Sequence, residues 1–456
     1  MTNRTPENDR RTFLRGGAAL TLLHAFPFAT TLFASAAASA QSAGDYRALV
    51  CVFLNGGNDQ SNTIVPIGSD YAAYQRARGE LALPASSLLP LSPVGYSGPP
   101  LGLHPSLSAL QPLFASGQMA IVANVGTLVA PINRAQWNNG RSTVATPFQL
   151  FSHSDQFRHW QTGLPDRVSS TGWLGRVSDL LNRGFNPSSG VSMNMSVGGN
   201  NMLQVGQNTV QYQLNAQGAV RVGALSNLYG STTGGMALRR LMTQGGSDLF
   251  GRELNAISAR SIDTEVLVSS ALGGSAMTSA FPDTSVGRQL RMVARMISAR
   301  TLLGQRRQVF FVQQGGYDFH DDLINDHSAR LRELGDGLAA FQRATADLGV
   351  SDAVTTFTAS EFGRALQSNG RGSDHGWGGH QFVLGGAVAG QRLYGRFPTV
   401  ALGGPEDAGQ GRLIPTTSVD EFAATLCRWF GVPLSDLPTV VPNLGRFASS
   451  NLGFLG

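Results

Sequence analysis

A short acidic and histidine-bearing segment in the second half of the chain has the residue types of a metal site. The apolar run 309–312 (VFFV) is followed by two glutamines and two glycines, and then by four potential ligands within five residues: Asp318, His320, Asp321 and Asp322. A run of β-branched and aromatic residues predicts a buried strand, and the glycine pair permits a tight turn. Ligands at the carboxyl end of a central strand are typical of α/β proteins. We therefore expect a site at this edge of a sheet.

The histidines support this interpretation. Seven histidines follow residue 40, and six of them lie in or beside three motifs at predicted strand ends or helix starts: SHSDQFRH, YDFHDD and SDHGWGGH. Imidazole and carboxylate groups together suit Zn, Mn, Fe or Ni, and the lack of ligating cysteines argues against a structural zinc site. The sequence predicts one or two divalent ions, with Zn or Mn favoured. His327 falls on the apolar stripe of a predicted helix, where a packed core histidine is favoured over a ligand.

Two other predicted strands also end in acidic residues. The strand 48–54 enters the loop NGGNDQSN, in which Asp59 is the only carboxylate. Asp59 is a candidate ligand, with a turn aspartate bonded to its own backbone as the alternative. The strand 354–358 leads to Glu361 and Arg364. Arg364 has the chemistry to clamp an anion, and an equal alternative is a surface salt bridge.

A predicted helix brings a third kind of group. Ser152 or Ser154 can cap a helix that Gly163 ends, and Asp155 lies in its first turn, where acidic side chains oppose the dipole. The free amides of such a terminus can bind an anion. Capping alone explains the serines and the aspartate, but it does not explain His153.

The elements that must position these residues alternate between strands and helices. The patterns predict strands at 48–54, 119–125, 309–312, 354–358 and 382–384, and helices at 106–116, 152–163, 288–303, 323–348 and 418–430. Strand–helix–strand order predicts a mostly parallel sheet in an α/β protein. Residues 190–285 are rich in Gly, Asn, Gln and Ser with weak alternation, which predicts a β-rich or irregular insertion, or a cap over the site.

Composition excludes several classes of protein. All 34 basic residues are arginine, so no Schiff-base lysine, P-loop lysine or Ser-Lys dyad is possible. With 42% apolar residues a large core can form, and the two cysteines, Cys51 and Cys427, lie in apolar segments where buried free thiols are expected. The formal charge of +5 falls to +3 without residues 1–40, which is too small to argue for nucleic-acid binding.

Residues 1–40 resemble a twin-arginine export signal. The motif DRRTFLR precedes a moderately apolar stretch and the small-residue site ASA. We expect recognition by the twin-arginine export machinery, removal of residues 1–40, and a periplasmic or secreted protein of residues 41–456. The alternative is a membrane anchor, but the apolar stretch contains His24 and Pro27, and no later segment has the roughly 20 apolar residues of a membrane span.

The order of motifs LNGGND, SHSD, GGYDFH, ASEFGR, SDHGWG and PTTSVDEFAATLCRWFG resembles the exported bacterial family called domain of unknown function 1501. That family is grouped with the alkaline phosphatase and sulfatase superfamily. The resemblance implies a three-layer α/β/α sandwich with a mostly parallel central sheet, and metals that serve the cleavage of phosphate or sulfate esters.

The resemblance also implies roles for particular residues. It implicates Asp318 and His320 after one strand, Glu361 where the superfamily has Asp-His, and His375 with Asp374 and His380 in the late loop. The nucleophile position, counted back from Thr162-Gly163, falls on His153 between Ser152 and Ser154, where the superfamily has Ser, Thr or a modified Cys. His153 and Ser154 are thus the catalytic candidates.

Two functions remain open from the sequence. The first is an exported metal-dependent hydrolase acting on an anionic phosphate or sulfate ester. The second is a non-catalytic periplasmic protein with the same fold that binds a metal, a carbohydrate or a polymer, or acts in assembly. The changed nucleophile position and the Asn/Gln-rich insertion favour the second.

Overall fold

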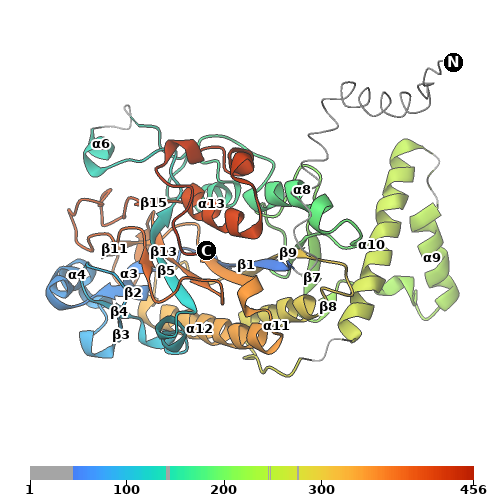
Figure 1. Cartoon of the computed structure of the whole chain (residues 1–456), viewed down its shortest axis with the longest axis horizontal. Coiled ribbons are helices and arrows are strands. Elements are labelled where there is room, and N and C mark those ends of the chain that lie inside the picture. The colour runs from blue at the N-terminus through green and yellow to red at the C-terminus, as the bar shows by residue number, and fades with distance from the viewer. Residues whose placement is uncertain (1–44, 140–143, 245, 247, 275–276) are drawn as a thin grey trace, which may run out of the picture. The chain divides into compact units, whose positions relative to one another are not determined.

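A ten-stranded, mostly parallel sheet forms the centre of the molecule (Figure 1). The structure is a computed structural model that describes residues 45–456 except 140–143, 245, 247, 275 and 276. In sheet order the strands are β14 (Leu393–Tyr394), β5 (Met119–Gly126), β13 (Gly379–Leu384), β10 (Val354–Ala359), β1 (Arg47–Leu54), β9 (Arg307–Gln314), β6 (Asn194–Ser196), β7 (Tyr212–Asn215) and β8 (Gly218–Ala219), with β15 (Thr417–Ser418) beside β5. Among the longer strands, β13 runs antiparallel to both neighbours.

Helices cover both faces of the sheet, which gives the three-layer α/β/α sandwich expected from the sequence. Helices α11 (Ser285–Ser298) and α12 (Leu323–Asp347) lie on one side, and α8 (Trp173–Phe185) and α13 (Val419–Phe430) on the other (Figure 1). Successive residues of β1 alternate between the two cores: Val50 and Val52 pack with α11 and α12, while Cys51 and Phe53 pack with α8 and α13. This alternation is why the strand is apolar throughout.

The buried thiols expected from the sequence are confirmed. Cys51 and Cys427 are both free and buried, one in β1 and the other in α13. Burial raises the pKa of the Cys51 thiol well above its usual value, so the group stays a neutral, packed side chain.

The helix predicted at 106–116 is shorter than expected. A 3₁₀ turn occupies Pro105–Leu107, and α5 spans only Gln111–Ala115. Pro112 has no amide hydrogen and its ring clashes with the preceding turn, so it is accepted only in the first turn of a helix. The proline therefore starts a new helix and interrupts the predicted one.

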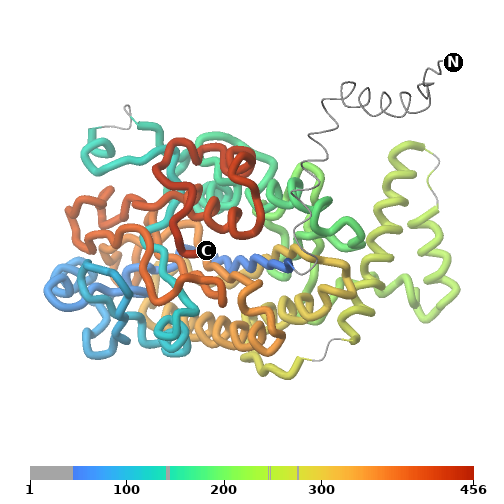
Figure 2. The backbone as a smooth tube through the Cα atoms, in the orientation of Figure 1, coloured from blue at the N-terminus to red at the C-terminus, as the bar shows by residue number. Residues whose placement is uncertain are grey.

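The segment 190–285 contains a two-helix arm that the sequence did not predict. The short strands β6 to β8 agree with the expected β structure, but the expectation is wrong for α9 (Thr232–Gln244) and α10 (Leu249–Gly273). In α9 only Gly235 is buried, and apolar side chains of the arm face solvent, with Phe250 85% exposed. In Figure 2 the arm is the yellow-green segment at the right of the picture. A cap over the site stays a prediction.

Two small sheets complete the carboxyl edge of the central sheet. The hairpin of β11 (Arg364–Ser368) and β12 (Ser373–His375) pairs Arg364 with His375. A second sheet contains β2 (Ile64–Pro66), β4 (Leu101–Leu103) and β3 (Leu89–Leu91), and it packs beside α4 (Tyr71–Arg78). None of the described helices combines the length and the apolar composition that crossing a bilayer requires.

Candidate metal centre

Three parallel strands end level with one another and deliver the candidate residues to one place. The register pairs Phe53 of β1 with Ala359 of β10, and Leu54 of β1 with Gln314 of β9. The loops that follow carry Gly56, Asp318 and Glu361. The β11–β12 hairpin adds His375, and α7 (His153–Thr162) adds its first residue.

Four side chains form what we call the histidine–aspartate cluster: His153, Asp318, His320 and His375. Potential ligand atoms of His153, Asp318 and His375 all lie within 4.8 Å of one another. The Asp318 carboxylate is 3.3 Å from Nε2 of His153, 3.2 Å from Nε2 of His375 and 3.0 Å from Nε2 of His320. The two Nε2 atoms of His320 and His375 are 3.1 Å apart. All four residues are candidates from the sequence, His153 as a catalytic group and the other three as ligands, and the structure brings them together.

Hydrogen bonds on the outer side of two imidazoles fix how they face the cluster. Nδ1 of His375 is 2.7 Å from the Phe151 carbonyl oxygen. Because a carbonyl only accepts, Nδ1 carries the proton, and burial lowers the pKa of His375 so that the ring is neutral. Its Nε2 then presents a lone pair 3.2 Å from a carboxylate oxygen of Asp318. Two acceptors this close require a proton or a cation between them.

Glu361 orients the ring of His153 in a similar way. Its Oε1 accepts from the Gly56 amide at 2.7 Å and lies 3.0 Å from Nδ1 of His153. The hydrogen bond to Glu361, helped by both carboxylates, raises the pKa of His153 against the opposing effect of burial. The second oxygen of Glu361 is buried and has no hydrogen-bond partner among the described residues. A carboxylate–histidine pair facing a metal position is a common arrangement in metal sites.

The donor set fits a divalent ion of the size of zinc. Metal–nitrogen and metal–oxygen bonds of about 2.0–2.2 Å in a tetrahedron place ligand atoms roughly 3.3–3.5 Å apart. The contacts of Asp318 with the three histidines, at 3.0–3.3 Å, are close to this spacing. The orphaned Glu361 oxygen and the inward lone pair of His375 are the observations that favour a cation here.

Arg364 does not have either of the roles considered from the sequence. Its side chain is fully buried, and Nη1 donates to Asp318 Oδ1 at 2.7 Å and to the Gly56 carbonyl at 3.1 Å. Burial alone would raise the pKa of Asp318, but the hydrogen bond and charge of Arg364 lower it below its usual range. Arg364 therefore holds Asp318 ionised and fixed, which makes it neither an exposed anion clamp nor a surface salt bridge.

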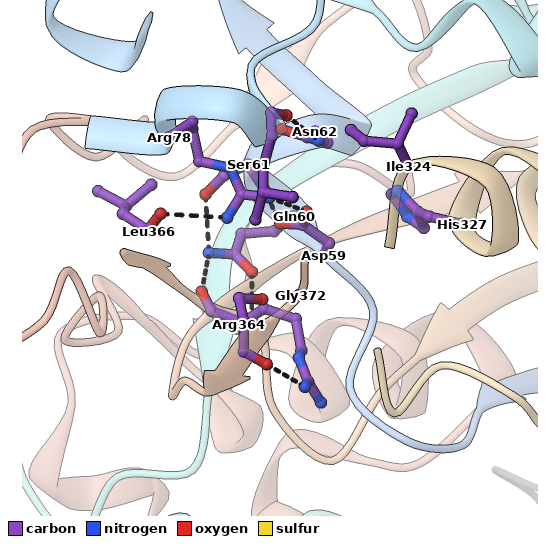
Figure 3. Close-up of polar contacts among 12 residues, drawn as sticks. Asp59, Gln60, Ser61, Asn62, Arg78, Ile324, His327, Arg364, Leu366 and Gly372 are labelled. Atoms are coloured by element: carbon purple, nitrogen blue, oxygen red, sulfur yellow. Dashed lines mark hydrogen bonds and ion pairs between the residues drawn. The ribbon is translucent and has the colours of Figure 1, made fainter. Parts of the chain in front are cut away.

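Gln60 in turn fixes the backbone of Arg364. Its side-chain amide donates to the Arg364 carbonyl at 2.9 Å and accepts from the Arg364 amide at 2.7 Å, as Figure 3 shows. Gln60 begins the short helix α3 (Gln60–Thr63) in the loop after β1. This two-way contact joins that loop to β11.

The structure does not bring Asp59 to the cluster. Its side chain is fully buried, one oxygen pairs with the Arg78 guanidinium, and the other accepts from the Ser61 amide at 3.2 Å. Arg78 also donates to the carbonyls of Ala365 and Leu366, so it connects α4 with β11 (Figure 3). Asp59 is a turn aspartate, as in the alternative interpretation, and nothing in its local sequence predicts its ion pair with Arg78.

Three other sequence candidates lie outside the cluster. His380 is buried in β13, where its Nδ1 accepts from the Asn124 amide at 3.1 Å and its ring stacks on Phe397. Asp374 approaches His320 Nδ1 only to 3.8 Å. Ser154 is exposed, and its hydroxyl contacts Ser152 at 3.2 Å in the same helical turn.

His327 is the packed core histidine that the sequence favoured. It is 1% exposed, and its Nε2 lies 3.0 Å from Oδ1 of Asn58. The ring of His104 packs against it at 5.5 Å between centroids. Burial lowers the pKa values of His104, His327 and His380 to about 3.

These buried neutral histidines predict acid sensitivity. Each folded-state pKa of about 3 lies below the ordinary 6.5, so the unfolded chain binds more protons in this window. Stability is fully present above pH 6.5 and is lost as the pH falls toward 3, by about 1.4 kcal/mol per pH unit for each histidine. We expect the free energy of unfolding, measured in urea at pH 7, 6 and 5, to depend less steeply on pH in His380→Asn than in the wild type, by about 1.4 kcal/mol per pH unit. Asparagine keeps an acceptor for the Asn124 amide. An unchanged slope would show that His380 is protonated or solvated in the folded state.

Sequence reasoning missed several residues around the cluster. Arg78 ends helix α4, and nothing in its local sequence marks it as the partner of Asp59. Phe151 contributes a backbone carbonyl, which any residue type supplies. Arg412 donates from Nε to the His375 carbonyl at 3.0 Å, across a loop of more than thirty residues whose closure only the tertiary structure gives.

A mostly parallel sheet with imidazole and carboxylate groups at its carboxyl edge defines an α/β protein with a metal-type site. Residues 46–441 match the family model described as "Protein of unknown function (DUF1501)". The chain belongs to this family, as its motifs suggested. No curated protein matches the sequence.

Solved structures with a similar arrangement include sulfatases and transferases. The chain is similar to the PsFucS1 sulfatase from Pseudoalteromonas sp. at 11% identity, covering 87% of this chain and 70% of that one with a TM-score of 0.36. It is also similar to the lipoteichoic acid synthase LtaP from Listeria monocytogenes, at 8% identity, 88% and 78% coverage and a TM-score of 0.33. The soluble domain of the lipooligosaccharide phosphoethanolamine transferase A from Neisseria meningitidis is similar at 10% identity, with 85% of this chain and 88% of that chain covered and a TM-score of 0.31. At this level of similarity the matches carry no argument about reaction or substrate.

Proposed function

We propose that the protein is an exported metal-dependent hydrolase that acts on phosphate or sulfate esters. The observation that supports this most is the inward lone pair of His375, 3.2 Å from the Asp318 carboxylate, because a cation between these two acceptors would satisfy both. His153, Asp318, His320 and His375 would hold the ion. A bound divalent ion supplies Lewis acidity toward an ester oxygen and lowers the pKa of a bound water.

The protein's own residues support the handling of an anion. His153 is the first residue of α7, where the free amides and the positive end of the helix dipole favour negative charge. Glu361 holds the proton on Nδ1 of His153, so that Nε2 is available either to a metal or to a substrate as nucleophile. The contacts favour His153 over Ser154 in this role, because Ser154 bonds only within its own turn.

A non-catalytic metal-binding protein is the second candidate. The observation in its favour is that His153 lies between Glu361 and Asp318, with one ring nitrogen 3.0 Å from the first and the other 3.3 Å from the second. With Nε2 beside the Asp318 carboxylate, the imidazole is placed to share a cation with Asp318, and a nitrogen bound to an ion cannot also attack a substrate. Such a protein would bind a carbohydrate or polymer, or act in assembly outside the cytoplasm.

Export through the twin-arginine pathway is part of the proposal. The motif that supports it lies in residues 1–40, which are outside the described residues. Loss of export after replacing Arg10 and Arg11 by lysine, with unchanged synthesis of the precursor, would support it.

Metal content and turnover measured on the same preparation separate the two functions. The protein is purified from an exporting host, analysed for Zn and Mn, and assayed with aryl phosphates and aryl sulfates beside His375→Ala. About one ion or more per chain, with turnover that His375→Ala lacks, supports the hydrolase. Metal with turnover no higher than that of His375→Ala supports the second function. A metal content equal to that of His375→Ala after incubation with Zn and Mn contradicts both.

A further inference from the structure

A second arginine, Arg412, lies beside the cluster, and unlike Arg364 it has N–H groups that no described residue accepts. Nε of Arg412 donates to the His375 carbonyl at 3.0 Å, and its guanidinium lies over the Phe151 ring, 4.8 Å from the centroid. The side chain is only partly buried. Among the described residues no hydrogen bond or ion pair involves Nη1 or Nη2 of Arg412, so the outer edge of its fork is open.

Phe151 connects this arginine to the cluster and to α7. Its carbonyl accepts from Nδ1 of His375, and its ring supports the guanidinium. Its backbone is left-handed, with a φ of 73°, a conformation that is rare for an aromatic residue. Strain of this kind persists only where surrounding contacts impose it, and it is common at binding sites. Phe151 lies two residues before the start of α7. Its contacts with His375 and Arg412 therefore hold these three residues together beside that helix end.

From this arrangement we infer that Arg412 is the oxyanion-binding residue of the site. Its two open Nη groups bind two oxygens of a phosphate or sulfate monoester, while the reacting end of the ester faces the histidine–aspartate cluster. This rests on the proposed function for the identity of the ester, but the oxyanion site itself does not require turnover.

Charge and geometry both favour this role. Asp318 and Glu361 bring negative charge to the cluster, and the charge of Arg364 is already engaged by Asp318. A dianionic ester approaching this site needs further positive charge, which Arg412 supplies from a position that solvent reaches. A planar guanidinium matches two oxygens of a tetrahedral oxyanion, and stacking on Phe151 holds it in one orientation before the anion binds.

The test measures anion binding directly. Inorganic phosphate and inorganic sulfate are titrated calorimetrically into the metal-loaded full-length mature protein, the variants Arg412→Gln and Arg412→Lys, and the control Arg371→Gln. Arg371 is a neighbouring surface arginine, 70% exposed and paired with Asp321. Loss of two charge-assisted hydrogen bonds should weaken the binding of at least one anion by about ten- to a hundredfold in Arg412→Gln. Arg412→Lys should recover only part, because lysine cannot form the fork, and Arg371→Gln should bind as the wild type does.

Metal content, measured on every sample, shows whether a weak binder still has its cluster. Wild-type affinity for both anions in Arg412→Gln overturns the inference, and so does full recovery in Arg412→Lys. If Arg412→Gln loses metal as well, Arg412→Lys decides: a lysine variant that retains metal yet binds the anion more weakly than wild type supports the inference, and one that binds as wild type does overturns it. Anion binding that depends on Arg412 without ester turnover would support this inference while contradicting the hydrolase. Ester turnover with an unchanged KM in Arg412→Gln would contradict this inference while supporting the hydrolase.

Discussion

Replacing Arg78 by methionine should lower the free energy of unfolding by about 3–5 kcal/mol, the usual cost of removing one partner of a buried ion pair. Arg78 and Asp59 both have fully buried side chains and pair directly. Without the guanidinium, the one hydrogen bond left to the Asp59 carboxylate from the described part of the chain is that of the Ser61 amide. Arg78 also bonds two carbonyls of β11, the strand that begins with Arg364, so the loss extends toward the candidate metal centre. Equilibrium unfolding in urea measures the change.

A double variant and a surface pair make the test of Arg78 specific. Adding Asp59→Asn to Arg78→Met removes the unpaired charge and should restore part of the stability, because the two effects are coupled. Arg260→Met removes one partner of an exposed pair, with Arg260 and Glu253 66% and 63% exposed, and should cost less than about 1 kcal/mol. Equal costs for Arg78→Met and Arg260→Met would show that the Asp59–Arg78 pair is solvated.

Replacing Asp318 by asparagine should have the largest effect on metal binding. Asp318 contacts all three histidines of the cluster, and its negative charge is the one that a cation would meet there. Losing an outer partner of a ligating histidine costs about 10–100-fold in metal affinity. Glu361→Gln should fall within that range, because glutamine still accepts from the Gly56 amide but lacks the charge. Asp318→Asn should exceed it.

Competition with a chromophoric chelator measures these affinities. Asp374→Asn is the matched control, since Asp374 lies beside the cluster with its carboxylate 3.8 Å from Nδ1 of His320. Wild-type affinity in Asp318→Asn would place any metal elsewhere in the protein. An effect of Asp374→Asn as large as that of Asp318→Asn would mean that Asp374 is a ligand, as the sequence alone had allowed.

The sequence predicted the strands and the direction of the sheet well, because an apolar strand covered on both faces leaves a continuous signal. It placed Asp318 and His320 at the edge of the sheet for the same reason, because strand ends in a parallel sheet share one edge, whereas His375 was indicated by the resemblance of its loop to the family. The two-helix arm was missed because the segment 190–285 is rich in Gly, Asn and Ser, a composition typical of turns and loops.

The errors in the site concern partners rather than residue types. An aspartate in a glycine-rich loop looks the same whether it faces an ion or a guanidinium, and the choice between them depends on Arg78 in another element. Arg364 likewise looked available until its burial against Asp318 was visible. His380 and His375 are five residues apart, but one lies within β13 and the other at the end of β12, and this difference decides which of them reaches the cluster.

The thinly packed arm formed by α9 and α10 has a consequence for how the molecule responds to stress. Helix α9 buries only Gly235, so its backbone hydrogen bonds are most of what stabilises it. Isolated helices of this length are only marginally stable in water. Its amide protons should exchange with deuterium long before those of β1 or β9, since regions with few apolar contacts open locally at low free energy. A protease should also cut there first and leave a nicked protein whose sheet, with the chemistry at its edge, stays folded.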